Sequence, residues 1–320
     1  MHVLITGADG FVGRALAKRL SRDAHLGARP ITRLSLADLS FGNAPQREGL
    51  VHRLAGDLAY VRWLGAALGD GPVDVVFHLA SVPGGTAEAS PALARRVNLD
   101  ATLGLLERGR AQVEAGGAAP IFVFASSIAV FGAMAARVTD DTVPRPVLTY
   151  GAHKLVCEVL VDDFSRRGWI DGRSLRVPGV LARPPARTGQ LSAFLSDIIR
   201  ELAAGRLFAC PMSPTATTWA SSLPNVVHNL IHAAQVDGSA WGAHRSVTLP
   251  TLHFSMADLV EAMATLHRPA IHALVSYEPQ ERIEALFGRF PGLDTPRAQA
   301  LGFCSDSDLA ALVRGALAHN

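Results

Sequence analysis

The segment TYGAHK at 149–154 places a tyrosine and a lysine four residues apart in a chain that has few of either. The 320 residues include three tyrosines and two lysines, whereas arginine occurs 28 times. Residues four apart on a helix share a face, so Tyr150 and Lys154 are expected to point the same way. An ammonium beside a phenol stabilises the phenolate and makes it a usable general base. Arginine, with its broader charge, would not replace Lys154 in this task.

A hydroxyl group that could complete such a site lies in FASSIAVFG at 124–132. The preceding run, IFVFASS at 121–127, is typical of a buried strand, and ligands gather at the carboxyl ends of strands in α/β sheets. A serine of this segment, Ser126 or Ser127, is therefore expected to polarise the reacting oxygen atom. The alternative is that these serines are turn or cap residues.

Three glycines follow the first expected strand, HVLIT at 2–6, in the segment ITGADGFVGRAL. Gly7 suits a tight turn, Gly10 lets a pyrophosphate approach the backbone, and Gly13 allows close packing of helix on strand. The helix that begins there would present N–H groups and a partial positive charge to phosphates. The pattern predicts a dinucleotide site; a structural turn with glycines kept for packing is the alternative.

Asp38 ends the second expected strand, about 25 residues beyond Gly13. A carboxylate there can accept hydrogen bonds from the hydroxyls of the adenosine ribose, and it would repel a 2′-phosphate. The sequence therefore favours NAD over NADP. Arg33 lies five residues earlier and is a poor candidate for holding that phosphate. The alternative is that Asp38 is a turn residue in ADLS.

The elements that must position these side chains alternate through the first half of the chain. Apolar runs typical of strands buried on both faces occupy 2–6, 31–37, 73–80, 121–127 and 174–180. Amphipathic segments typical of helices occupy 11–22, 91–114 and 150–167. Such alternation indicates βαβ units with right-handed crossovers, and hence an α/β fold with a Rossmann-type doubly wound parallel sheet.

The pattern changes after about residue 180, where ARPPARTGQLS is a proline-rich loop. We expect an NAD-binding domain over 1–180 and a smaller, mainly substrate-binding α/β lobe over 181–320. RSVTLP at 245–250 is expected to return to the first sheet as one more strand. Ser255 and Asp258 occupy the positions of a capping box at the start of a further helix.

Composition excludes several classes of function. The net charge is +2 and the arginines are spread along the chain, so nucleic acid is not an expected partner. No apolar run is long enough for a membrane span, and the N-terminus does not resemble a signal peptide. Three widely spaced cysteines, Cys157, Cys210 and Cys304, show no metal-binding or disulfide pattern. We therefore expect a cytoplasmic protein without a metal site.

The glycine spacing G-x-x-G-x-x-G, followed by Ser127, Tyr150 and Lys154, resembles the extended branch of the short-chain dehydrogenase/reductase family. By this resemblance GDL at 56–58 flanks adenine, VFHLAS at 76–81 wraps the cofactor, and RVPGV at 176–180 meets the nicotinamide carboxamide. The catalytic residues implied are Ser127, Tyr150 and Lys154. The cofactor contacts implied are Gly7, Gly10, Phe11, Val12, Gly13, Asp38, Asp57, Leu58, Ala80, Ser81, Asn98, Tyr150, Lys154 and Val177.

The resemblance also bears on the substrate. Several segments within 148–314 are similar to a bacterial branch of the family that oxidises the four-carbon sugar acid D-erythronate, so a small sugar acid is the expected substrate. Arg183 or Arg187 could bind its carboxylate, although both could equally lie in solvent. Thr217 and Thr218 stand where nucleotide-sugar enzymes of the family commonly carry Arg and Asp.

Two other functions remain open from the sequence. One is a nucleotide-sugar 4-epimerase or dehydratase that keeps NAD tightly bound. The other is an NAD-binding sensor without catalysis, which would have no need of Ser127, Tyr150 and Lys154 together. The resemblance further implies a homodimer formed through the helix that carries Tyr150 and the helix before it. Leu155, Val159 and Leu160 could form that contact or could face the sheet.

Overall fold

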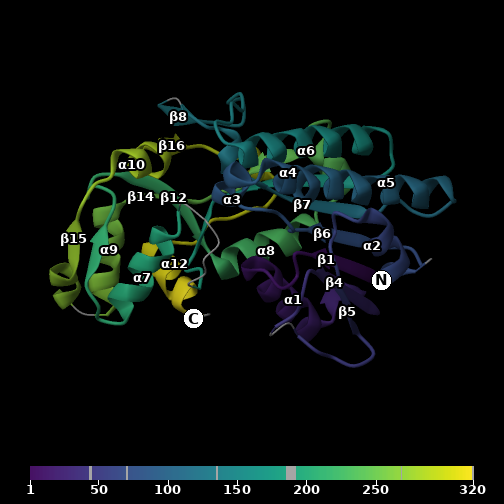
Figure 1. Cartoon of the computed structure of the whole chain (residues 1–320), viewed down its shortest axis with the longest axis horizontal. Helices are drawn as coiled ribbons and strands as arrows, with labels where there is room; N and C mark the ends of the chain where they lie inside the picture. The colour runs from purple at the N-terminus through teal and green to yellow at the C-terminus, as the bar shows by residue number, and fades with distance from the viewer. Residues whose placement is uncertain (43–44, 70, 135, 185–191, 268, 319–320) are drawn as a thin grey trace. The chain divides into compact units, whose positions relative to one another are not determined.

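The computed structural model describes residues 1–42, 45–69, 71–134, 136–184, 192–267 and 269–318. The chain forms two compact units that interleave along the sequence (Figure 1). Unit 1 contains 1–132, 144–176 and 227–248, whereas unit 2 contains 133–143, 177–226 and 249–320.

A seven-stranded sheet is the centre of unit 1, in the order β13-β9-β7-β6-β1-β4-β5. The pairings β1–β4, β1–β6, β4–β5, β6–β7 and β9–β13 are parallel. The strands are β1 (His2–Thr6), β4 (Arg33–Asp38), β5 (Val51–Ala55), β6 (Val75–His78), β7 (Ile121–Ser127), β9 (Asp171–Val177) and β13 (Ser246–Thr248). The strand order reverses between β1 and β6, which is the switch point where doubly wound sheets bind ligands.

Helices cover both faces of this sheet, with α5 and α6 on one side and α1 on the other (Figure 1). On the α5 and α6 side, Val76, Phe122 and Phe124 of the strands pack against Leu106 and Val161 of the helices. Burial of such apolar side chains is the main stabilising term of the layer. The helices of unit 1 include α1 (Phe11–Asp23), α2 (Val61–Leu68), α3 (Gly84–Ala89), α4 (Pro91–Ala94), α5 (Ala101–Glu114) and α6 (Thr149–Arg166).

Two elements differ from the sequence prediction. The segment predicted as one helix over 91–114 is divided by a π-helical turn, η1 (Arg95–Asp100), between α4 and α5. The strand predicted over 174–180 begins earlier, at Asp171, and ends at Val177. Pro178 has no N–H group to donate to a strand partner, so the chain leaves the sheet there. It continues as β10 (Gly179–Leu181) in another sheet.

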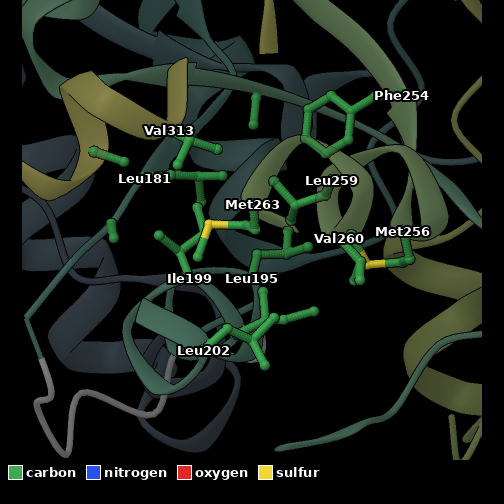
Figure 2. Close-up of a cluster of buried hydrophobic side chains, with 14 of the residues drawn as sticks. Leu181, Leu195, Ile199, Leu202, Phe254, Met256, Leu259, Val260, Met263 and Val313 are labelled. Atoms are coloured by element: carbon green, nitrogen blue, oxygen red, sulfur yellow. The ribbon is translucent and has the colours of Figure 1, made fainter. Parts of the chain in front are cut away.

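Unit 2 contains a three-stranded sheet in the order β10-β12-β14, formed with β12 (Thr217–Ser222) and β14 (Leu252–Ser255). Its core gathers side chains from β10, β14 and the helices α7 (Phe194–Ala203), α9 (Met256–Leu266) and α12 (Leu309–Leu317). Figure 2 shows Leu181, Ile199, Met263 and Val313 meeting there. Smaller elements are β8 (Arg137–Val138), β11 (Phe208–Cys210), β15 (Val275–Tyr277), β16 (Gly292–Leu293), α10 (Glu281–Phe287) and α11 (Pro296–Ala300).

The start of α9 has the capping box predicted from the sequence. The Ser255 hydroxyl accepts from the backbone N–H of Asp258, and the Asp258 carboxylate accepts from the backbone N–H of Ser255. α8 (Leu223–Ala233) begins in unit 2 and ends in unit 1. Within the described ranges, no helix combines the length and the apolar character that a membrane crossing requires.

Candidate active site

The glycine loop joins β1 to α1 in a conformation that requires glycine at two positions. Gly7 has φ +68°, and a Cβ on it would lie 2.7 Å from the backbone nitrogen of Ala80, in the loop after β6. A Cβ on Gly13 would lie 2.0 Å from the carbonyl oxygen of Gly7. Gly10 is exposed and precedes α1 without any side-chain cap. The backbone of the α1 N-terminus, where Phe11 and Val12 lie, can therefore be approached closely by a phosphate.

Asp38 lies beside this loop. One of its carboxylate oxygens accepts from the backbone N–H of Asp9, and the other accepts from Leu39, both at 2.8 Å. Each carboxylate oxygen has two lone pairs, so Asp38 can also accept from ribose hydroxyls. The Asp9 carboxylate accepts from the backbone N–H of Gly42 at 3.0 Å, which links the glycine loop to the loop that follows β4.

Asp57 and Leu58 follow β5 at the same carboxyl edge of the sheet. The Asp57 carboxylate accepts from the backbone N–H of Ala59 at 2.9 Å and fixes the turn. Leu58 is buried against the face of the sheet that α5 covers. Asp38 also holds this turn, because its carbonyl oxygen accepts from the backbone N–H of Gly56. The turn can thus present main-chain groups to an adenine ring.

The loop after β6, with Ala80 and Ser81 at its start, is held by Asn98 from the π-helical turn. The Asn98 side chain accepts from the Val82 N–H at 2.7 Å and donates to the Val82 carbonyl at 3.1 Å. Because Asn98 is buried and its amide is paired in this way, its geometry supports a role in shaping the loop. Nothing in the sequence indicated that Val82 is the partner of Asn98.

Tyr150 and Lys154 lie one turn apart near the start of α6. The Lys154 ammonium lies 5.5 Å from the centre of the Tyr150 ring and 4.7 Å from that of Phe124. It donates to the carbonyl oxygen of Ala125 at 2.7 Å. Tyr150 packs against the cluster that contains Val82. Lys154 is 3% exposed, so water screens its charge little and its interaction with neighbouring groups is strong.

Ser127 ends β7 and caps the 3-10 turn η2 (Ile128–Val130), because its hydroxyl accepts from the backbone N–H of Ala129 at 3.2 Å. The start of α6 approaches this turn closely. A Cβ on Gly151 would lie only 2.2 Å from the carbonyl oxygen of Ala129. Because residue 151 is a glycine, the start of α6 can lie directly against the turn that Ser127 begins.

His78 lies in β6 between the glycine loop and α5. Its ring nitrogens contact the hydroxyls of Thr6 at 2.6 Å and Thr102 at 2.8 Å. Complete burial, together with the nearby Lys154 charge, lowers the pKa of His78 to about 3. His78 is therefore neutral and connects the strands β1 and β6 to the helix α5.

The structure describes only some of the residues that the sequence analysis expected on the substrate side. Val177 ends β9, and its neighbour Pro178 begins the passage to β10. The backbone of Arg183 accepts from Arg200 and donates to Ser196, whereas Arg187 lies outside the described residues. Thr217 donates to the carbonyl oxygen of Phe290 at 2.8 Å, and Thr218 is buried. These two threonines provide no positive charge for a diphosphate.

The arrangement of unit 1 combines two chemical capacities. The glycine loop, Asp38 and the turn after β5 form a cradle whose shape and donors fit the adenosine diphosphate half of NAD. The ends of β7 and α6 bring a hydroxyl, a phenol and an ammonium to the carboxyl edge of the same sheet. Among the described residues, no group of three or more His, Cys, Asp or Glu side chains could hold a metal ion.

Comparison with known proteins agrees with this geometry. Residues 3–221 match the model of the NAD dependent epimerase/dehydratase family. A D-erythronate dehydrogenase of Cupriavidus necator is 38% identical over 322 residues, covering 98% of this chain and 97% of the relative. A D-erythronate dehydrogenase of Haemophilus influenzae is 32% identical over 319 residues, covering 98% of both.

A solved structure is similar over nearly the whole chain. The nucleoside-diphosphate-sugar epimerase of Agrobacterium tumefaciens has a TM-score of 0.90 and is 34% identical. The match covers 98% of this chain and 92% of that one. Two kinds of substrate are thus named among the similar proteins, although the fold is shared.

Proposed function

The chain belongs to the NAD-dependent epimerase/dehydratase family as an NAD-dependent dehydrogenase of the extended short-chain type, and we propose that it oxidises the 2-hydroxyl group of D-erythronate to the 2-oxo acid. The arrangement of Tyr150 and Lys154 against the end of β7 is the observation that carries the dehydrogenase chemistry. The near full-length similarity to two D-erythronate dehydrogenases supports the substrate.

In the proposed mechanism each residue has one task. Tyr150 removes the proton from the 2-hydroxyl group, and the Lys154 ammonium stabilises the phenolate that accepts it. Ser127 donates a hydrogen bond to the same substrate oxygen as it becomes a carbonyl. Bound NAD would supply the acceptor for the hydride that leaves the carbon carrying this hydroxyl. Lys154 would also donate to the nicotinamide ribose, so that one ammonium would orient both cofactor and base.

NAD would be held mainly by the backbone of the glycine loop and by Asp38. We propose the remaining contacts at the ends of strands: Asp57, Leu58, Ala80, Ser81 and Val177. We propose that Asn98 acts on the cofactor through the loop that it fixes. For the substrate carboxylate, Arg183 is the candidate within the described residues, because a guanidinium can bind a carboxylate through two parallel hydrogen bonds.

The first experiment follows NADH formation when the purified enzyme and NAD are mixed with sugar acids of three to six carbons, including D-erythronate and L-threonate. A stoichiometric, NAD-dependent rise with a four-carbon acid supports the proposal. Tyr150→Phe should then reduce kcat by at least about 10²-fold, since it removes the proton acceptor, while NADH binding stays nearly intact. Loss of NADH binding in this variant would contradict a role in proton transfer.

A second function is favoured by one observation, the similarity to the A. tumefaciens nucleoside-diphosphate-sugar epimerase. The same three residues could then oxidise a sugar transiently while NAD stays bound. Purified protein that carries tightly held NAD and forms no net NADH would support it. Thr217 and Thr218 weigh against it, because they cannot replace the charge of an arginine at a diphosphate.

We also propose that the enzyme is a cytoplasmic homodimer. Val156 and Val159 on the outer face of α6 are 47% and 62% exposed, and Leu103 of α5 is 39% exposed. Leu160, in contrast, packs against the core cluster of the sheet. The exposed apolar residues of α5 and α6 suit a contact with the same helices of a second copy. Sedimentation of wild type and Val159→Arg would test it, since the variant should sediment as a monomer.

A further inference from the structure

A buried carboxylate behind the site joins three elements of unit 1. Glu158 lies on α6, one turn beyond Lys154, and is 3% exposed. One of its oxygens accepts from the hydroxyl of Ser126 on β7 at 2.5 Å. Arg176 on β9 donates to the carboxylate from Nε at 3.0 Å and from Nη2 at 2.8 Å. Helix α6 is therefore tied to two neighbouring strands through one side chain.

The positive charge of Arg176 offsets the cost of burying the Glu158 carboxylate in the interior. A buried carboxylate without a partner is strongly destabilising, whereas an arginine that donates two hydrogen bonds to it compensates much of that effect. Arg176 is itself largely buried and packs over the Phe131 ring, 5.1 Å from its centre. Glu158 would otherwise be the natural partner of Lys154 on the same helix face. With Arg176 in place, the Lys154 ammonium instead donates to Ala125.

The contacts fall on three consecutive residues at the end of β7. The Ala125 carbonyl accepts from Lys154, and the Ser126 hydroxyl donates to Glu158. Ser127, the next residue, carries the hydroxyl proposed to act on the substrate. The distance between this hydroxyl and the phenol of Tyr150 thus depends on how firmly the end of β7 is held against α6.

We propose that Glu158 is a positioning residue, which together with Arg176 holds Ser126 and so sets Ser127 against Tyr150 and Lys154. This inference rests on the proposed function, because Ser127 matters only if it acts in turnover. Glu158 is buried against the end of β7, and its effect passes through the backbone of that strand. A displacement of about 1 Å at such a site can cost about 10²-fold in rate.

The test uses Ser126→Ala, a small change that removes the link from β7 and leaves the ion pair intact. Ser165→Ala is the matched control. Ser165 is also buried on α6, donates to the Val161 carbonyl at 2.6 Å and accepts from the Gly172 N–H at 3.0 Å. Each variant removes one buried hydroxyl that forms hydrogen bonds with α6 or within it, but Ser165 lies at the end of α6 far from Tyr150.

Ser126→Ala should lower kcat about tenfold and leave the KM for NAD within about twofold, because only the end of β7 moves. Hydrogen–deuterium exchange over 121–131, which contains the amide of Ala129, should become faster. Ser165→Ala should change neither. Equal losses of kcat in both variants, or an unchanged kcat and exchange in Ser126→Ala, would overturn the proposal.

A second pair of variants removes both charges together, so that neither is left buried alone. Glu158→Gln with Arg176→Met keeps an acceptor for Ser126 and should retain most of the wild-type kcat. Glu158→Leu with Arg176→Met removes the acceptor and should behave like Ser126→Ala. Equal kcat in the two double variants would overturn the proposal. A wild type that forms no NADH with any sugar acid would refute the proposed function, while the exchange measurement would still decide whether Ser126 holds β7.

Discussion

Gly151→Ala is the most direct test of how closely α6 must approach the end of β7. The added Cβ would lie 2.2 Å from the carbonyl oxygen of Ala129 and 2.9 Å from its carbonyl carbon. Ordinary van der Waals contact begins at 3.4 Å, so the two backbones must separate by about 1 Å. Both of these atoms belong to the backbone, and the third neighbour, the ring carbon Cβ of Pro146 at 3.0 Å, cannot rotate away either.

The expected magnitude follows from this displacement. A shift of about 1 Å between Tyr150 and the turn that Ser127 begins should lower kcat about 10²-fold. Overpacking should cost about 1–3 kcal/mol of the free energy of unfolding. Replacing a helical glycine by alanine should, in turn, raise the free energy of unfolding by up to about 1 kcal/mol. The variant is therefore expected to fold and to be impaired mainly in catalysis.

The assay measures kcat and KM with a sugar acid, NADH binding by fluorescence, and thermal unfolding. Gly71→Ala is the control, because among the described residues, its chain neighbours apart, no heavy atom lies within 4 Å of its added Cβ, and its φ is not in the left-handed region. The control should keep the wild-type kcat. A Gly151→Ala enzyme that folds and keeps kcat within about threefold of wild type would refute the reasoning, since the separation would then have no effect on the reacting groups.

Two further predictions concern the cofactor and acid stability. Asp38→Asn should raise the KM for NAD about tenfold and improve the use of NADP, because the charge that repels a 2′-phosphate is removed. Steady-state kinetics with both cofactors would measure this change. An unchanged preference for NAD would contradict the role of Asp38. His78 has a folded pKa of about 3, below its unfolded value near 6.5, so its contribution to stability is complete above pH 6.5 and is lost as pH falls toward 3. Between these limits the free energy of unfolding should fall by up to about 1.4 kcal/mol per pH unit from this group. His78→Gln should flatten that slope in denaturant titrations at several pH values; an unchanged slope would show that other groups, such as the buried His2, account for it.

The local parts of the site were predictable from the sequence because short-range geometry fixes them. The spacing of Tyr150 and Lys154 puts them on one helix face wherever that helix lies. Gly7 needs its left-handed backbone in any turn of this shape, and its place between a strand and a helix was evident from the flanking residues. The alternation of apolar runs likewise indicated the parallel sheet before its order was known.

The sequence did not reveal the break at Pro178 or the π-helical turn at 95–100. The apolar run of 174–180 continues past Pro178, although a proline cannot donate to the sheet. The π-helical turn leaves no mark in a periodicity that reads as helix throughout, and its consequence is the contact of Asn98 with Val82. Both features depend on which backbone groups find partners, and hydrophobic periodicity does not record that.

By itself, then, the sequence determined which side chains are candidates for the reacting groups and which strand and helix ends carry them. Only the tertiary structure decided how those groups are held. Glu158 meets Ser126 and Arg176, which are 32 and 18 residues away along the chain, and nothing in the spacing marks them as partners. Gly151 is needed because α6 happens to rest on the Ala129 carbonyl. Such contacts arise from the packing of whole elements, so the residues that form them can be identified only from the assembled sheet and its helices.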